Sequence, residues 1–173
     1  MITTSPTTEE VWDWLSEVPD PEIPVISVTE LGIVREVRRE GDTLVVAVTP
    51  TYSGCPATAV IDLEIEAKLR EKGIRDLRLE RRLSPPWTTD WIASEARDKL
   101  RRYGIAPPVE GTASGGLMAA RAARLEGSSN LSVACPRCGS ARTEKVSQYG
   151  STPCKAAYRC TDCLEPFDYF KCI

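Results

Sequence analysis

The cysteines of this 173-residue chain are unevenly placed: six of the seven lie between Cys135 and Cys172. The chain has no histidine, so cysteine, aspartate and glutamate are the metal-binding side chains it offers. Four of the clustered cysteines form two C-x-x-C pairs, Cys135 with Cys138 and Cys160 with Cys163. Two such pairs joined by a hairpin are typical of a zinc ribbon, in which four thiolates surround one metal ion. We therefore predict that these four cysteines bind a structural zinc ion.

The other two clustered cysteines, Cys154 and Cys172, belong to neither pair. Each could replace a ligand, act as a free thiol or pack in the core. A closed shell of four thiolates leaves no coordination position for chemistry, so we expect the ribbon to be a scaffold or a docking surface. An iron–sulfur centre on the same four cysteines is the alternative metal site.

The composition argues against two classes of partner. The formal net charge is −3 and no basic tract is present, so the sequence does not predict binding to nucleic acid. No stretch is long and apolar enough to span a membrane. Residues 1–10 are polar and lack the apolar core of a signal peptide, and we expect a cytoplasmic protein.

The seventh cysteine, Cys55, stands between a predicted strand and a predicted helix. The apolar run 44–48 indicates the strand, and the amphipathic run 57–72 indicates the helix. Pro56 suits the first position of that helix, which would make Cys55 its N-cap. The helix N-terminus would then favour the Cys55 thiolate, as in a cysteine that binds a metal or acts as a nucleophile. A small residue in a tight turn is the plain alternative, and the pattern does not separate the two.

The first 105 residues are expected to form an α+β domain, a small mixed sheet with helices packed on it. The sequence pattern predicts, in order, a helix capped by Thr7 and Glu10, a hairpin of strands 33–37 and 44–49, the helix 57–72, a strand over 77–83, and a helix that starts near residue 89 and ends at Gly104. The buried stripe of the helix 57–72 is expected to contain Val60, Leu63 and Ala67, widened by Ile61, Ile65 and Leu69.

Residues 106–131 are rich in proline, glycine, serine and alanine, and we expect a flexible linker with one weak helix at 118–124. Residues 132–173 would then form the zinc ribbon as a second, small domain. Metal binding would stabilise this segment, which is too short to fold on its own.

A turn with two prolines and two carboxylates occupies residues 20–24. Asp20 and Glu22 could bind a metal ion or orient a thiol. The pattern favours a rigid turn in which the Asp20 side chain accepts hydrogen bonds from nearby backbone N–H groups.

The chain resembles the SufT-like iron–sulfur assembly family in three motifs: DPEIP at 20–24, ELGIV at 30–34 and SGCP at 53–56. Two further segments, PWTTDW at 86–91 and the C-terminal run 150–173, resemble the PaaD family of bacterial phenylacetate degradation. Proteins of that family are encoded with the multicomponent phenylacetyl-CoA epoxidase. The resemblance covers nearly the whole chain.

This resemblance implies an accessory protein, not an enzyme, that helps the epoxidase system to mature. The client would be the reductase component, with its [2Fe–2S] cluster, or the di-iron oxygenase. The resemblance also implies that Cys55 is the functional thiol and that Asp20 and Glu22 lie near it. A [2Fe–2S] cluster needs four protein ligands, so Cys55 alone would handle iron or a cluster only transiently. The zinc ribbon would dock the client or stabilise a homodimer.

Two other functions are compatible with the same residues. The first is a stoichiometric docking subunit of the oxygenase that does not handle iron. The second is a thiol enzyme that uses Cys55. The second is disfavoured because the chain has no histidine, and because Asp20 and Glu22 would be weak bases unless their pKa values were raised.

Overall fold

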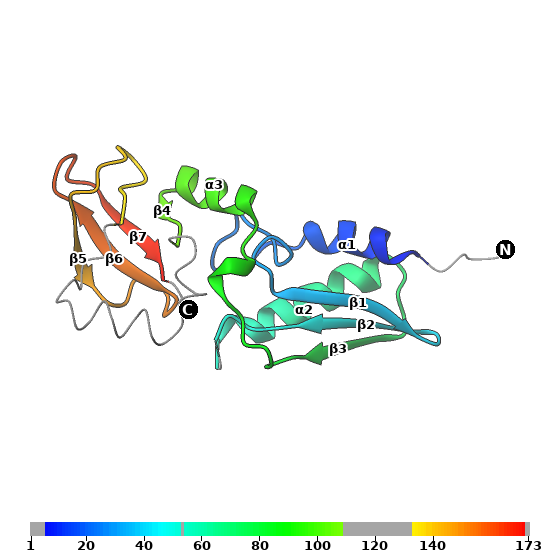
Figure 1. The fold of residues 1–173 in the computed structure, drawn as a ribbon. Coiled ribbons are helices and arrows are strands. Elements are labelled where there is room, and N and C mark those ends of the chain that lie inside the picture. Colours follow the sequence, from blue (N-terminus) through cyan, green and yellow to red (C-terminus); the bar gives the residue numbers. More distant parts are fainter. Residues whose placement is uncertain (1–5, 53, 109–132, 172–173) are drawn as a thin grey trace. The chain divides into compact units, whose positions relative to one another are not determined.

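The computed structural model describes residues 6–52, 54–108 and 133–171, and the chain divides into two compact units between Trp87 and Thr88 (Figure 1). Ser53, the predicted weak helix at 118–124 and Cys172 lie outside the described residues. Within the described residues, no helix combines the length and the apolar character needed to cross a membrane.

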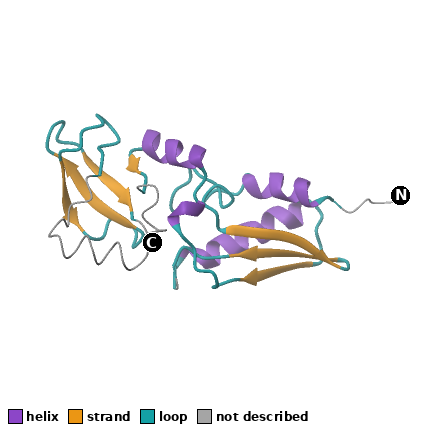
Figure 2. Ribbon diagram, in the orientation of Figure 1, coloured by secondary structure: helices purple, strands orange, loops and turns teal. Residues whose placement is uncertain are grey.

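The first unit is a three-stranded mixed sheet with two helices. Its elements are α1 (Thr8–Ser16), β1 (Val34–Glu40), β2 (Thr43–Val48), α2 (Ala57–Glu71) and β3 (Leu77–Arg81). The strand order is β1-β2-β3, with β1 antiparallel and β3 parallel to β2. Figure 1 shows α2 running along the sheet, and Figure 2 distinguishes the helices from the strands by colour. The predicted α+β class, the hairpin and the mixed sheet are confirmed.

The ends of both helices follow from local sequence. The Thr7 hydroxyl accepts a hydrogen bond from the Glu10 N–H at 3.2 Å, and the Glu10 carboxylate accepts one from the Thr7 N–H at 2.8 Å. This reciprocal pair confirms the predicted cap of α1. Gly73 directly follows α2 and its C-cap Lys72, and its φ of +89° is a left-handed conformation that suits glycine.

The prediction of which α2 side chains are buried was partly wrong. Ala57, Ile61, Ile65 and Leu69, spaced four residues apart, form the buried stripe. Val60 and Leu63 are 43% and 66% exposed, and Ala67 is exposed as well. A helix on the surface of a two-layer fold buries one stripe, and the sequence offered two apolar stripes of similar quality.

The central strand β2 is buried on both faces. Leu44 through Val48 are each at most 2% exposed, although the two helices can cover only one face of the sheet. Val45 and Ala47 point to the other face, since side chains alternate along a strand. Such a strand normally needs a second covering layer.

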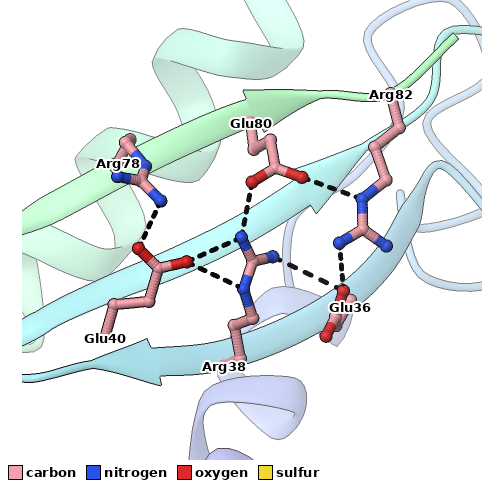
Figure 3. A network of polar contacts seen from close by, with 6 residues as sticks. All are labelled: Glu36, Arg38, Glu40, Arg78, Glu80 and Arg82. Atoms are coloured by element: carbon pink, nitrogen blue, oxygen red, sulfur yellow. Dashed lines mark hydrogen bonds and ion pairs between the residues drawn. The ribbon is translucent and has the colours of Figure 1, made fainter.

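Charged side chains from β1 and β3 supply that layer (Figure 3). Val45 is flanked in register by Arg38 and Arg78, and Ala47 is flanked by Glu36 and Glu80. Paired residues share one face of a sheet, so these long side chains extend over Val45 and Ala47.

The covering side chains are joined into one network of three arginines and three glutamates (Figure 3). Arg38 contacts Glu80 at 2.5 Å and Glu40 at 2.9 Å, which links the two edge strands across β2. Arg78 contacts Glu40 at 2.6 Å. Arg82 contacts Glu80 at 2.9 Å and also pairs with Glu36. We call these six residues the arginine–glutamate network.

The second unit is a four-stranded sheet preceded by helical segments. Its elements are a 3-10 turn η1 (Thr89–Trp91), α3 (Ser94–Tyr103), β4 (Ile105–Ala106), β5 (Thr143–Ser147), β6 (Lys155–Cys160) and β7 (Pro166–Phe170). The strand order is β4-β7-β6-β5, and only the β4–β7 pair is parallel. Tyr158 packs against Phe167 and Tyr169, with ring centroids 5.9 and 5.6 Å apart, in the core of this sheet.

The helix predicted to start near residue 89 is interrupted. The 3-10 turn η1 ends at Trp91, Ile92 is extended (φ −68°, ψ 125°), and α3 begins only at Ser94. The end at Gly104 is confirmed, because Gly104 has a left-handed φ of +96°. The short strand β4 that follows pairs with β7, so α3 and β4 belong to the second unit. The boundary between the two compact units, after Trp87, therefore lies before the domain boundary expected after residue 105. The expected domain boundary stays a prediction.

The two cysteine pairs end in corresponding backbone turns. Gly139 follows Cys138 with a φ of +74°, and Leu164 follows Cys163 with a φ of +64°. Leu164 is the one non-glycine residue with positive φ among the described residues. Its side chain is 59% exposed, so little burial offsets the strain of this conformation.

Replacing Leu164 with glycine should therefore stabilise the metal-loaded protein. We expect Leu164→Gly to raise the free energy of unfolding by up to about 1 kcal/mol, because relief of left-handed strain exceeds the entropy that glycine adds to the unfolded chain. Gly139→Ala is the matched substitution in the opposite direction. The added Cβ would have no atom within 4 Å, so any loss of stability, expected to be about 1 kcal/mol, would come from the left-handed backbone conformation. Denaturant titration measures both, and a destabilised Leu164→Gly would contradict the strain.

Acid should weaken the arginine–glutamate network. Hydrogen bonds from Arg38 and then Arg82 lower the pKa of Glu80 from 4.5 to about 2. The charged form is favoured in the folded state, so its stabilising effect is present above pH 4.5 and is lost as the pH falls from 4.5 toward 2. Unfolding titrations across that window should show a shallower acid dependence for Glu80→Gln than for the wild type.

The control for this measurement is Glu64→Gln. Glu64 lies on α2 and has no ion pair among the residues described. The control substitution should leave the acid dependence of the wild type unchanged, and equal slopes for Glu80→Gln and the wild type would contradict the role of the network.

Candidate functional site

The four paired cysteines come together in the second unit. The sulfur atoms of Cys135, Cys138, Cys160 and Cys163 all lie within 4.8 Å of one another. The Cys135–Cys163 and Cys138–Cys160 sulfur pairs are 3.7 and 3.6 Å apart. A tetrahedral zinc site with Zn–S bonds of about 2.3 Å separates its sulfurs by about 3.8 Å. This donor set therefore fits a four-coordinate zinc ion, and we call it the four-cysteine group.

The backbone of both turns aims the sulfurs at one point. Cys160 is the last residue of β6, and its N–H donates to the Glu165 carbonyl at 2.9 Å, which folds the chain back toward β7. In the first turn, the Gly139 N–H donates to the Cys135 carbonyl at 2.9 Å. Cys135 and Cys160 are buried while Cys138 and Cys163 are exposed, so the group lies at the surface of the core.

The four thiols influence one another's ionisation. A hydrogen bond from the Cys163 N–H is the largest cause that lowers the pKa of Cys160, to about 7. The Glu165 N–H lowers the pKa of Cys163, but burial and the neighbouring sulfurs outweigh it and raise that pKa to about 12. Thiols this close cannot all become thiolates unless a cation lies among them. The group is suited to a metal ion and poorly suited to act as four independent thiols.

Polar contacts that the sequence analysis missed hold the two turns together. Asp162, inside the second C-x-x-C pair, accepts a hydrogen bond from the Ser140 hydroxyl and pairs with Arg142. These contacts, the Ser140 hydroxyl first, lower the pKa of Asp162. In the sequence, the position of Asp162 between two ligands was the feature that could have pointed to this role. Its partners are 22 and 20 residues away, and only the folded structure shows them.

Of the two remaining clustered cysteines, only Cys154 lies within the described residues. Cys154 is 5% exposed and lies 3.0 Å from the Thr152 hydroxyl, outside the four-cysteine group. The structure therefore places Cys154 in the buried interior, outside the set of four ligands. Cys172 lies outside the described residues, and its role stays open.

Cys55 lies one residue further from its helix than predicted. The helix α2 begins at Ala57 with Pro56 as the N-cap, and no side chain caps it. The prediction of Cys55 as N-cap was wrong because the helix starts one residue later than expected, with Pro56 in the N-cap position; the Cys55 carbonyl accepts the Thr58 N–H at 3.2 Å. Cys55 is half-buried between exposed Gly54 and exposed Pro56. The loop thus gives the thiol partial access to solvent.

The Asp20 turn forms as the sequence pattern favoured. Asp20 is 5% exposed, and its Oδ1 accepts hydrogen bonds from the Glu22 N–H at 2.9 Å and the Ile23 N–H at 2.8 Å. Glu22 is half-buried on the same turn. Over the described ranges, the four-cysteine group is the one set of three or more cysteine or carboxylate side chains close enough to hold a metal together. Cys55, Asp20 and Glu22 do not form such a set, and their joint role stays a prediction.

Trp87 is a positioning residue that the sequence analysis noted only as part of a motif. It is 3% exposed, and its indole N–H donates to the Leu31 carbonyl at 3.0 Å. This hydrogen bond ties the segment after β3 to the segment before β1. The Thr49 N–H donates to the Ile33 carbonyl at 2.8 Å, so the start of the Cys55 loop is fixed to the same region.

Two family models match the two parts of the chain. Residues 8–74 match the model of an iron–sulfur cluster assembly protein, and residues 119–171 match the model of the PaaD zinc beta ribbon domain. The first match contains the Asp20 turn and Cys55. The second contains the four-cysteine group.

Curated relatives support both matches. The chain is 45% identical over 97% of its length, and 94% of the relative's, to an Escherichia coli protein named as the D component of a "putative 1,2-phenylacetyl-CoA epoxidase". It is 34% identical, over 54% of its own length and 90% of the relative's, to an Fe-S protein maturation auxiliary factor of Porphyromonas gingivalis. A protein of the same description from Bacillus subtilis is 32% identical over 55% of this chain and 86% of its own. The chain belongs to the PaaD family, that of the D components of phenylacetyl-CoA epoxidase.

Proposed function

We propose that this chain is a non-catalytic accessory protein of a phenylacetyl-CoA epoxidase system. In this role it helps to deliver iron or an iron–sulfur cluster to the reductase or to the oxygenase component. Similarity to an epoxidase D component over nearly the whole chain supports the assignment to an epoxidase system. Similarity of the first half to Fe-S maturation factors supports iron or an iron–sulfur cluster as the cargo that is delivered. The observation that carries the proposal is the presence of two unlike cysteine sites in one chain.

The four-cysteine group is the structural site. Cys135, Cys138, Cys160 and Cys163 would hold zinc, with sulfur separations that suit a tetrahedral shell. The bound ion supplies a cross-link between the two turns and no open position for chemistry. The ribbon then offers a stable surface for docking the client.

Cys55 is the site proposed to handle the cargo. Its thiol is half-buried, belongs to no group of potential ligands in the described residues, and sits on a loop between β2 and α2. A single thiolate is one ligand of the four that a [2Fe–2S] cluster needs, so the cargo would leave readily for a client with a complete site. Incomplete coordination favours transfer over storage.

The Asp20 turn has two roles in this proposal. Asp20 uses Oδ1 to accept two backbone N–H groups, so it positions the turn. Glu22 is the carboxylate proposed to complete the iron site with Cys55 during transfer.

The thiol of Cys55 should be required for delivery but not for folding. Cys55→Ser should abolish cluster acquisition by a co-produced reductase, because serine is a poor iron ligand, while the unfolding transition changes little at this half-buried loop position. Iron and acid-labile sulfide of the purified reductase are the readout. Cys154→Ala, which removes a cysteine outside the four-cysteine group, is the matched control.

The same experiment separates the alternative function. A reductase with a full cluster in the presence of Cys55→Ser would contradict cargo handling and favour a docking subunit that does not touch iron. Stable co-purification with the oxygenase in both variants would then be expected.

Metal analysis tests the four-cysteine group. We expect roughly one zinc per chain in the wild type and in Cys55→Ser, and loss of zinc in Cys160→Ser. Cys160 is fully buried in the core of the second unit, so zinc loss should open that unit to proteases while the first unit resists. Elemental analysis and limited proteolysis measure the two effects. Stoichiometric iron with visible thiolate-to-iron absorption in Cys55→Ser would instead assign an iron–sulfur centre to the four cysteines.

A further inference from the structure

The second unit contains a cleft that the proposed function does not use. Its volume is about 500 Å³, a size typical of small-molecule sites. Arg97 and Arg101 of α3 line one side. The remainder of the described lining includes Pro107, Val133 and Pro136, and also Cys135 of the four-cysteine group. Among the described lining residues, the cleft thus has two cationic groups and no carboxylate.

Arg97 is a buried cation whose two hydrogen-bond acceptors in the described segments are both neutral. It is 8% exposed, and its guanidinium donates to the Thr89 and Pro108 carbonyls, each at 2.7 Å. Both acceptors are neutral, and no carboxylate within the described segments pairs with Arg97. Burying a charge without an opposite charge is costly, and the guanidinium has further N–H donors beyond the two used here.

Arg101 adds a second positive charge one helical turn later. Its side chain is 54% exposed and pairs with Asp98 at 2.6 Å, a surface contact of the kind that contributes little energy. Arginines four residues apart on a helix repel each other. An anion bound in the cleft would relieve this repulsion and compensate the charge of Arg97.

A nearby hydroxyl also lacks a hydrogen-bond partner. Thr89 is fully buried, and its Oγ1 has no partner among the described atoms, although its carbonyl accepts from Arg97. A folded chain rarely leaves a buried hydroxyl unpaired. The residue that anchors Arg97 through its carbonyl therefore has unused hydrogen-bonding capacity, although Thr89 is not among the described lining residues of the cleft.

We propose that this cleft binds a carboxylate attached to an apolar body. The planar guanidinium groups match the geometry of a carboxylate, and the apolar lining suits an alkyl or aryl group. A free monocarboxylate and the C-terminal residue of a protein both have this chemistry. The site is separate from Cys55 and does not depend on how the cargo is handled.

The test is an amide NMR titration of the full-length, zinc-loaded protein with hexanoate and with phenylacetate. Both should give saturable shifts at the amides of Ala106 and Gly139, which line the cleft. Acetate lacks the apolar body and hexanol lacks the charge. Each should therefore bind at least tenfold more weakly than hexanoate, which is the affinity change expected when one strong contact is lost.

Neighbouring arginines on α3 give a matched pair of variants. Arg101→Ala should weaken hexanoate binding about tenfold, since it removes a charged contact. Arg102→Ala should not, because Arg102 is exposed on the same helix and does not line the cleft. Asp98→Asn should strengthen binding, because it frees Arg101 from its ion pair.

Acetyl-glycyl-leucine, with a free carboxylate, distinguishes the two sources. Tighter binding than hexanoate supports a protein C-terminus as the ligand, and weaker binding supports a small monocarboxylate. The proposal is overturned by equal binding of hexanol and hexanoate, by equal effects of Arg101→Ala and Arg102→Ala, or by the absence of saturable shifts.

Discussion

Burial of β2 on both faces is the constraint on which the first unit depends. The helices cover the side of Leu44, Val46 and Val48, and the opposite side of a three-stranded sheet must be shielded in another way. The arginine–glutamate network meets this need with the aliphatic portions of long side chains, while their charged ends pair in water. Because the Cys55 loop continues directly from β2, the position of Cys55 is set by this strand.

Much of this arrangement could be predicted from local pattern. The Thr7–Glu10 cap, the turn between β1 and β2, and Gly73 and Gly104 after their helices are short-range signals, and each appears in the structure. The stripe of α2 was harder, because Val60 and Leu63 follow helical spacing as well as Ile61 and Ile65 do. Choosing between them requires knowing how the helix is rotated on the sheet, which sequence periodicity does not contain.

The candidate sites show the same division between local and distant information. The spacing of two C-x-x-C pairs was sufficient to predict that four sulfurs meet, because two such pairs in one segment are a known signature of a shared metal ion. The Asp20 turn was predictable for the same reason. The contacts of Asp162 with Ser140 and of Arg97 with Pro108 were not, since they join residues that only the folded chain brings together. Cys55 was placed one position off because proline favours the first helical position, whereas here Pro56 occupies the N-cap position and the helix starts at Ala57.

The network over β2 also bears on how the protein behaves among other chains. Both β1 and β3 are edge strands, and an open edge is a template on which another chain can add a strand. The arginine–glutamate network lies along these strands and the residue that follows β3, and its three arginines balance its three glutamates, so this face is covered by charged groups that sum to no net charge. A strand that added to β1 or β3 would have to displace or desolvate these paired ions. The residues that shield β2 therefore also protect the sheet from edge-to-edge aggregation, which matters for a protein whose proposed task requires it to meet partners and release them.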